Sequence, residues 1–110
     1  MQFAVTPVER PSDRVLHVSG KLDIATVTVL RDAVGKALAE GPPAVLVDLT
    51  TTRFVDSTGC RELVRTAKAG AAAGVAVGVV APPDNWRVRR VVDFMQFGAL
   101  LPVHDEAPFA

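Results

Sequence analysis

The chain has 110 residues, of which 49% are hydrophobic, and its twelve basic and twelve acidic side chains cancel to a formal net charge of zero. This length and composition predict one domain over residues 1–110 that buries roughly two thirds of the surface of its unfolded chain. A neutral chain has no general electrostatic attraction to nucleic acid or to an anionic membrane, so we expect no direct partner of either kind.

The first part of the chain predicts two strands followed by a helix. Residues 3–8 and 15–20 are short strand-like segments, and the turn residues at positions 10–13 between them predict a hairpin. From Thr26 the apolar residues recur at helical spacing, and Gly-Pro-Pro at positions 41–43 ends the pattern. The apolar side of this helix is formed by Val27, Leu30, Val34, Ala37 and Leu38.

The second part predicts strands that alternate with two more helices. Residues 44–49 and 75–81 are typical of buried strands, and residues 100–104 can form a final strand. The resulting order is ββαβαβαβ, an α/β fold. Alternating strands and helices favour a largely parallel sheet with helices packed on it, to which the leading hairpin adds an antiparallel pair.

Both of these later helices have an apolar stripe. The helix that starts at Ser57 is expected to end near Gly70 to Gly74, and its stripe comprises Cys60, Leu63, Val64, Ala67 and Ala71. The last helix starts at residues 82–85 and is expected to close at Gly98. Its apolar side comprises Val88, Val91, Val92 and Met95.

The sequence Asp-Ser-Thr-Gly at positions 56–59 joins the end of a β-branched segment to the start of a helix. Ser57 at that start could cap a free backbone N–H, and the helix dipole could accommodate negative charge added to its hydroxyl. In an open sheet of this kind, the turns that follow the strands share one end of the molecule. We therefore expect Asp23 and Asp56 to lie near Ser57, an arrangement that suits binding better than core packing.

No enzyme chemistry has the residues that it needs. A serine hydrolase would need a Gly-x-Ser-x-Gly elbow and a histidine near Ser57, but the chain has only His17 and His104, neither with an obvious route to it. A phosphoaspartate at Asp56 would need an acidic cluster where residues 7–10 read Pro-Val-Glu-Arg. The aspartic protease turn is one residue shorter, and phosphate-loop or Cys/His metal spacing does not occur. We expect no catalytic residue, cofactor or metal.

Compartment is predicted from the single cysteine and the N-terminus. Cys60 cannot form an internal disulfide, and the first residues lack the basic start and apolar segment of a secretion signal. The longest uncharged stretch, residues 69–81, is shorter than the ~20 residues of a membrane helix. A cytoplasmic protein is expected.

Three blocks resemble the STAS domain family, of the anti-sigma factor antagonist type. Gly-Lys-Leu-Asp at 20–23 is similar to the Gly-x-Leu-Asp block after the second strand, and residues 45–59 resemble the strand-to-helix signature, which is the specific block. Gly98 with Leu100 falls where a glycine and an apolar residue follow the third helix. The resemblance covers nearly the full length and implies a bacterial STAS fold.

The resemblance implies that an anti-sigma factor with serine kinase activity phosphorylates the serine after the signature aspartate, here Ser57. The unphosphorylated form would capture the anti-sigma factor and free a sigma factor for transcription, and the phosphorylated form would let go. A phosphate adds about −1.5 to −2 charge, which a helix N-terminus tolerates but Asp23 and Asp56 would repel in a docked interface. Thr58 is the secondary acceptor candidate, or simply the first helical residue.

Further partner-binding candidates lie on the same helix. Arg61, Glu62 and Arg65 are predicted to continue its exposed side beyond Ser57 and to form a docking surface with Asp23 and Asp56, although charged helix faces are usually just solvated. Both aspartates could also bond their own backbone in turns. The alternative function is a STAS scaffold or ligand-sensing subunit of a larger signalling or transport assembly, in which Ser57 is only a helix cap.

The chain departs from the family pattern at three places. Cys60 replaces a usual leucine, which suits a buried thiol or a redox handle, and Thr52 and Arg53 are polar where an apolar residue is usual. Residues 105–110 include Pro108 and leave room for one helical turn at most, so the C-terminal helix of the family is expected to be short or absent. A partner or a second copy in a homodimer could cover the sheet left bare.

Three arginines near the third helix could suggest a nucleic-acid site. Arg87, Arg89 and Arg90 lie close together with Trp86 alongside. In a neutral chain, three arginines on one amphipathic helix indicate a solvated face far more often than a nucleic-acid site.

Overall fold

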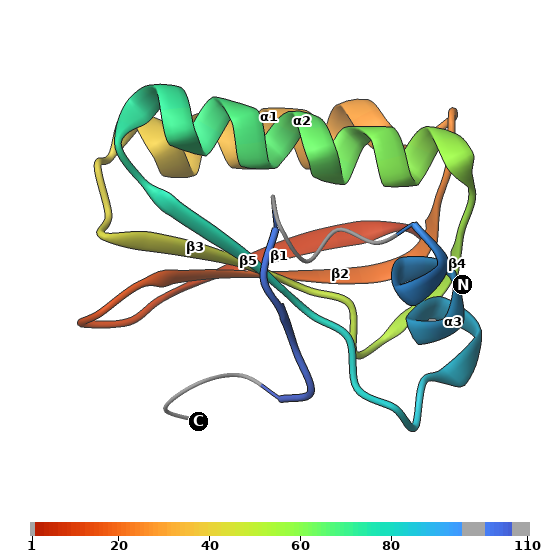
Figure 1. Cartoon of the computed structure of the whole chain (residues 1–110). Helices are drawn as coiled ribbons and strands as arrows, with labels where there is room; N and C mark the ends of the chain where they lie inside the picture. Colours follow the sequence, from red (N-terminus) through yellow and green to blue (C-terminus); the bar gives the residue numbers. More distant parts are fainter. Residues whose placement is uncertain (1, 96–100, 107–110) are drawn as a thin grey trace.

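The computed structural model describes residues 2–95 and 101–106, which form a mixed sheet with helices on it in the order ββαββαβαβ (Figure 1). Two long helices, α1 and α2, lie side by side on one face of the sheet, and the short helix α3 lies at the end of the molecule beside β4 (Figure 1). The elements are β1 (Ala4–Glu9), β2 (Arg14–Leu22), α1 (Val27–Ala39), β3 (Ala44–Asp48), β4 (Thr52–Val55), α2 (Ser57–Ala73), β5 (Ala76–Val80), α3 (Trp86–Phe94) and β6 (Val103–His104).

The strand order is β1-β2-β3-β5-β6, and β4 pairs with β2. Only the hairpin of β1 and β2 is antiparallel among the described pairs, so the predicted α/β class and largely parallel sheet are confirmed. The hairpin turn is held by Arg10, whose Nε and Nη2 donate to the Asp13 carboxylate at 2.6 and 2.7 Å. This contact holds the pKa of Asp13 below its usual value.

The structure adds one strand, β4, to the predicted order. β3 leaves β2 after His17 pairs with Asp48, and β4 then pairs in parallel with the last residues of β2. β4 is hard to recognise in the sequence because it begins with a polar residue, Thr52. In the structure Thr52 is buried, and its hydroxyl donates a hydrogen bond to the carbonyl of Val18 at 2.7 Å. A strand of four residues with a satisfied buried threonine carries no clear apolar alternation.

The core lies between the sheet and the pair α1 and α2. Most of the predicted apolar residues of both helices, including Leu30 and Leu63, are buried, Leu38 and Val64 are partly buried, and Ala71 of the predicted stripe on α2 is exposed. Gly70 lets α2 lie close to β5, because a Cβ there would come within 2.3 Å of a methyl group of Val77. Gly74 then ends α2 in a left-handed conformation with φ 72°, which confirms the predicted stop.

The third helix is shorter than predicted within the described residues. Val88 and Val92 are buried and Val91 packs partly against the core, but Met95 is 40% exposed at the C-cap position of α3, so it does not join the buried side. The expected closure at Gly98 lies outside the described residues. The same holds for Leu100 and for residues 107–110, on which the expectation of a short or absent C-terminal helix largely rests.

In the part of the chain that the structure describes, no helix is both long enough and apolar enough to cross a bilayer.

Candidate functional site

Ser57 is the first residue of α2, and the structure corrects its predicted role as the helix cap. The N-cap is Asp56, whose backbone is extended (φ −101°, ψ −172°) and whose Oδ1 accepts from the backbone N–H of Gly59 at 2.9 Å. A side chain caps best from this position because it reaches the N–H of the third helical residue. Its carboxylate also complements the helix dipole.

The hydroxyl of Ser57 is therefore not used by the fold. Ser57 is exposed, and its hydroxyl takes part in none of the hydrogen bonds formed among the described residues. Thr58 is half-buried. It is the second residue of α2, whereas one of the predictions made it the first. Ser57 thus offers the more accessible oxygen at the positive end of a 17-residue helix.

The structure brings Asp23 to the same end of the molecule, as predicted. Leu22, the last residue of β2, pairs with Val55, the last residue of β4, and its carbonyl accepts from the N–H of Asp56 at 3.4 Å. Asp23 and Asp56 thus directly follow paired strand ends. Asp23 Oδ1 accepts from the N–H of Ala25 at 3.0 Å, which is the turn-forming role that the sequence allowed.

Gly59 makes this approach possible, and sequence reasoning gave it no role. A Cβ at Gly59 would lie 2.5 Å from the carbonyl oxygen of Leu22 and 3.0 Å from a methyl group of Val55. Only glycine lets the first turn of α2 start against the ends of β2 and β4. Glycine destabilises a helix, so a glycine in the first turn of a predicted helix was the signal in the sequence that a close contact requires it.

Glu62 does not belong to the predicted exposed surface. Its side chain is 4% exposed and faces α1, where Arg31 donates to both carboxylate oxygens, from Nη2 at 2.7 Å and from Nε at 3.3 Å. Arg65 Nε lies 3.6 Å from the same carboxylate, while its own side chain is 65% exposed. Arg61 is exposed as expected. The structure therefore leaves Arg61 and Arg65, without Glu62, on the outer side of α2.

Cys60 lies under the site and not within it. Its side chain is fully buried, and burial, followed by the nearby charge of Asp56, raises the pKa of its thiol. A buried, protonated thiol is a poor nucleophile, so the interpretation as a core residue is confirmed over the redox handle.

The two histidines lie on other strands of the sheet. His17 Nδ1 lies 2.7 Å from Asp48 Oδ2 in the middle of the sheet, and His104 lies in β6. Among the described residues, neither histidine forms a hydrogen bond with Ser57. Among the described residues no group of three or more His, Cys, Asp or Glu side chains is placed to hold a metal ion.

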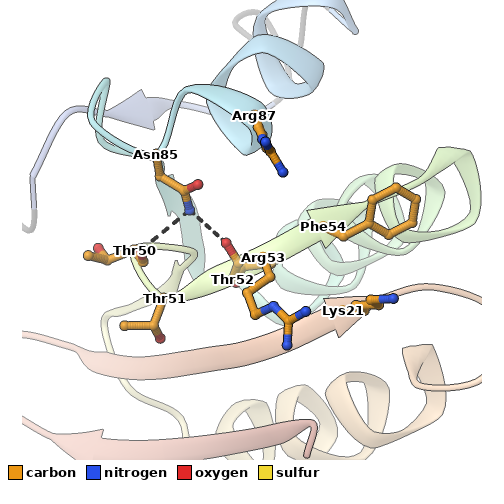
Figure 2. Close-up of a pocket in the computed structure, with 8 residues that line it drawn as sticks. All are labelled: Lys21, Thr50, Thr51, Thr52, Arg53, Phe54, Asn85 and Arg87. Carbon is orange, nitrogen blue, oxygen red and sulfur yellow. Dashed lines mark hydrogen bonds between the residues drawn. The ribbon is translucent and has the colours of Figure 1, made fainter. Parts of the chain in front are cut away.

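A cavity of about 600 Å³ lies along β4, the strand that leads to Asp56 and Ser57 (Figure 2). Asn85, the residue before α3, closes one side, since its amide donates to the carbonyls of Thr52 at 2.7 Å and Leu49 at 2.9 Å. These bonds confirm that the loops after β3 and β5 meet at one end of the molecule. The cavity is lined by Lys21, Thr50, Thr51, Thr52, Arg53, Phe54, Asn85 and Arg87.

Comparison with known sequences identifies relatives over much of the chain. A family model described as "Mlab, STAS domain" matches residues 5–102. The anti-sigma-F factor antagonist RsfB of Mycobacterium tuberculosis is 32% identical over 66 residues, which are 60% of this chain and 54% of RsfB. The chain thus spans about half the length of the curated relatives that it matches.

Comparison with solved structures gives the same picture. An anti-sigma factor antagonist from Mycobacterium paratuberculosis superimposes with a TM-score of 0.83 at 27% identity, over 96% of this chain and 87% of that one. The anti-sigma factor antagonist SpoIIAA in its unphosphorylated form gives a TM-score of 0.70 at 20% identity, over 96% and 90% of the two chains. The second likeness shows the fold alone.

Proposed function

Since the chain belongs to the STAS domain family, we propose that it is an anti-sigma factor antagonist whose binding is switched at Ser57. In the unphosphorylated form it binds an anti-sigma factor with serine kinase activity and so frees a sigma factor. Phosphorylation of Ser57 releases the anti-sigma factor. In this role the chain is a bacterial, cytoplasmic binding partner and phosphoacceptor, and not an enzyme, and residues 1–110 act as one domain.

The observation that carries the proposal is the exposed, unbonded hydroxyl of Ser57 at the first position of α2. The backbone N–H groups of the first helical turn have no partner within the helix, and they favour a phosphate in that place. Asp56 caps the helix whether or not Ser57 is modified. The fold therefore tolerates the phosphate, and its effect falls on a docked partner.

The release step follows from charge. Asp23 and Asp56 already place two carboxylates at neighbouring strand ends, and a phosphate on Ser57 adds about −1.5 to −2 charge beside them. A partner surface that fits the neutral hydroxyl would meet bulk and repulsion. We propose Asp23, Asp56, Arg61 and Arg65 as further contacts of the anti-sigma factor, and we leave out the buried Glu62.

The test is phosphorylation of the full chain by serine kinase anti-sigma factors of its source organism, followed by intact-mass measurement. We expect the mass of one phosphate on the wild type and on Thr58→Ala, which is the matched control, and none on Ser57→Ala. Ser57→Asp should bind the anti-sigma factor about tenfold more weakly, equivalent to about 1.4 kcal/mol. If Ser57→Ala is still fully phosphorylated, the acceptor is another residue.

The same experiment separates the alternative function. A STAS scaffold or ligand-sensing subunit would leave Ser57 unmodified, and the alanine variant would behave as the wild type in every binding assay. The form of that alternative in which Ser57 serves as the helix cap conflicts with the structure, because Asp56 fills that position.

A further inference from the structure

Two groups stand out among the twelve basic side chains of this protein. Arg10, Arg14, Arg31 and Arg89 each hold a specific carboxylate; Arg10 does so within the hairpin turn, and the other three join parts of the chain that lie far apart in the sequence. By contrast, four others make no ion pair among the described residues and gather at one end of the molecule: Lys21, Arg53, Arg87 and Arg90.

These four residues surround two adjoining cavities. The first is the cavity of about 600 Å³ along β4, where the cations come from β2, β4 and α3 (Figure 2). The second, of about 420 Å³, shares Arg53, Phe54 and Arg87 with the first and adds Trp86 and Arg90. Among residues 2–95 and 101–106, no acidic side chain lines either cavity. In a chain of zero net charge, this is a local excess of positive charge.

Two exposed aromatic rings lie among these cations. Phe54 is 46% exposed and Trp86 is 57% exposed, and the guanidinium of Arg87 lies 5.2 Å from the centroid of the Trp86 ring. Tryptophan and arginine dominate the binding energy of protein interfaces, and aromatic residues are enriched there. We call Lys21, Arg53, Phe54, Trp86, Arg87 and Arg90 the cationic–aromatic surface.

The cationic–aromatic surface is continuous with the Ser57 site. Lys21 pairs with Phe54 across β2 and β4, and the two strands end one residue later. Asp23 lies two residues after Lys21, and Asp56 lies two residues after Phe54. Two residues span roughly 7 Å along a strand. A partner that covers Ser57 would therefore also reach the cations, and it would meet negative charge at one part of the interface and positive charge at the next.

We propose that the cationic–aromatic surface docks an acidic segment of the anti-sigma factor, a segment that also carries an exposed apolar side chain. The inference rests on the proposed function and names where and with what chemistry the partner binds. Carboxylates of the segment pair with Lys21, Arg53, Arg87 and Arg90, and its apolar side chain covers the exposed rings. Opposite charges in two adjoining zones fix the orientation of the partner, which presents Ser57 to its kinase site.

The decisive variant reverses two of the charges. Arg53→Glu with Arg87→Glu should weaken binding of the anti-sigma factor about 100-fold and reduce its salt dependence, because paired charges become repulsive. The matched control, Lys36→Glu with Lys68→Glu, makes the same change in net charge at exposed positions on α1 and α2 and should stay within about twofold. Circular dichroism establishes that each variant is folded, and Trp86→Ala, which removes the ring without reversing a charge, should also weaken binding.

A second measurement needs no knowledge of the partner. Trp86 is the single tryptophan of the chain, so its fluorescence reports on this surface alone. Titration of the full chain with a short synthetic peptide of glutamates and leucines should change that fluorescence, and added salt should reverse the change. The same peptide with lysines in place of the glutamates should have no effect.

The outcomes separate the two proposals. If an anti-sigma factor binds the wild type and the Arg53→Glu, Arg87→Glu variant equally, the docking surface is wrong and the proposed function stands. If no anti-sigma factor of the source organism binds the wild type, the proposed function fails. The peptide then decides the surface, and unchanged Trp86 fluorescence up to about 1 mM peptide, a concentration that would detect binding of about −4 kcal/mol, would overturn it.

Discussion

Two acidic residues of the α2 region, Glu62 within the helix and Asp56 at its N-cap, lie in opposite surroundings. The side chain of Glu62 is 4% exposed, and its carboxylate accepts hydrogen bonds from Nε and Nη2 of Arg31. This ion pair joins α2 to α1. Asp56, six residues earlier in the chain, holds a backbone N–H and makes no ion pair among the described residues. The comparison teaches that an acidic side chain inside the helix can stabilise the fold through an ion pair. An acidic side chain at the start of the same helix can keep its charge available for a partner.

The largest effect is expected where the charge is buried. Glu62→Ala removes the partner of Arg31 and leaves a gap between α1 and α2, so we expect the free energy of unfolding to fall by about 2 kcal/mol. Urea denaturation measures it, with the neighbouring Arg61→Ala as the control, expected within about 0.5 kcal/mol of the wild type. An unchanged stability together with weaker binding of the partner would place Glu62 in the recognition surface after all.

A substitution at Gly59 should disturb both regions together. Gly59→Ala forces its Cβ against the carbonyl of Leu22, so α2 must shift at its start, at a cost of about 1–2 kcal/mol. The matched control is Gly35→Ala on α1, where an added Cβ meets no atom within 4 Å. That control should gain about 0.5–1 kcal/mol from helix propensity. Equal effects of the two changes would contradict the close packing at Gly59.

The N-cap of α2 is expected to contribute less to the free energy of unfolding than the close packing at Gly59. Asp56→Ala removes the acceptor of the Gly59 N–H and should lower the free energy of unfolding by about 1 kcal/mol. Asp56→Asn retains the acceptor and should retain most of the stability, while it removes the negative charge. Thermal unfolding followed by circular dichroism compares the two, and a loss as large in the asparagine variant would mean that the charge and not the cap matters.

Ser57 should matter to the partner and hardly to the fold. Ser57→Ala changes an exposed, unbonded hydroxyl, so its unfolding midpoint in urea should stay within about 0.5 kcal/mol of the wild type. Its phosphorylation should be lost. A drop in stability comparable to that of Asp56→Ala would show that the serine hydroxyl, too, takes part in capping.

The smallest effect is expected for chemical labelling of the Cys60 thiol in the folded protein. Its raised pKa leaves little thiolate near neutral pH, and its full burial blocks access, so the native protein should not react with a thiol reagent such as Ellman's reagent. In urea the same thiol should react at once. Rapid labelling of the folded protein would mean that the first turns of α2 open readily, which would weaken the contrast between its two regions.

The sequence was sufficient for the elements that carry a strong period. The turn at residues 10–13 and the apolar positions of α1 and α2, apart from the exposed Ala71, were predicted correctly, because hairpin turn chemistry and helical spacing are local signals. β4 was missed because its buried threonine is satisfied by a strand that is far away in the sequence. The cap was placed one residue late, since Asp56 and Ser57 are both good capping residues.

The site was harder to predict because it depends on tertiary contacts. Glu62 was placed on the exposed side since no local pattern says that Arg31, in another helix, covers it. The cationic–aromatic surface draws its cations from β2, β4 and α3, and in the sequence only the arginines near Trp86 stood out. Their neighbours Lys21 and Arg53 join them only once β2 and β4 have paired.

Asn85 gives that surface a further property. Its one amide group holds the carbonyls of Leu49 and Thr52, so the loop before β4 and the start of α3 are tied together without any partner present. The frame that carries Arg53 and Arg87 is thus already in place, and ordering it adds no entropic penalty on association. A preorganised frame favours rapid capture at the first encounter, which would suit the proposed antagonist, because such a protein competes with a sigma factor for the same anti-sigma factor.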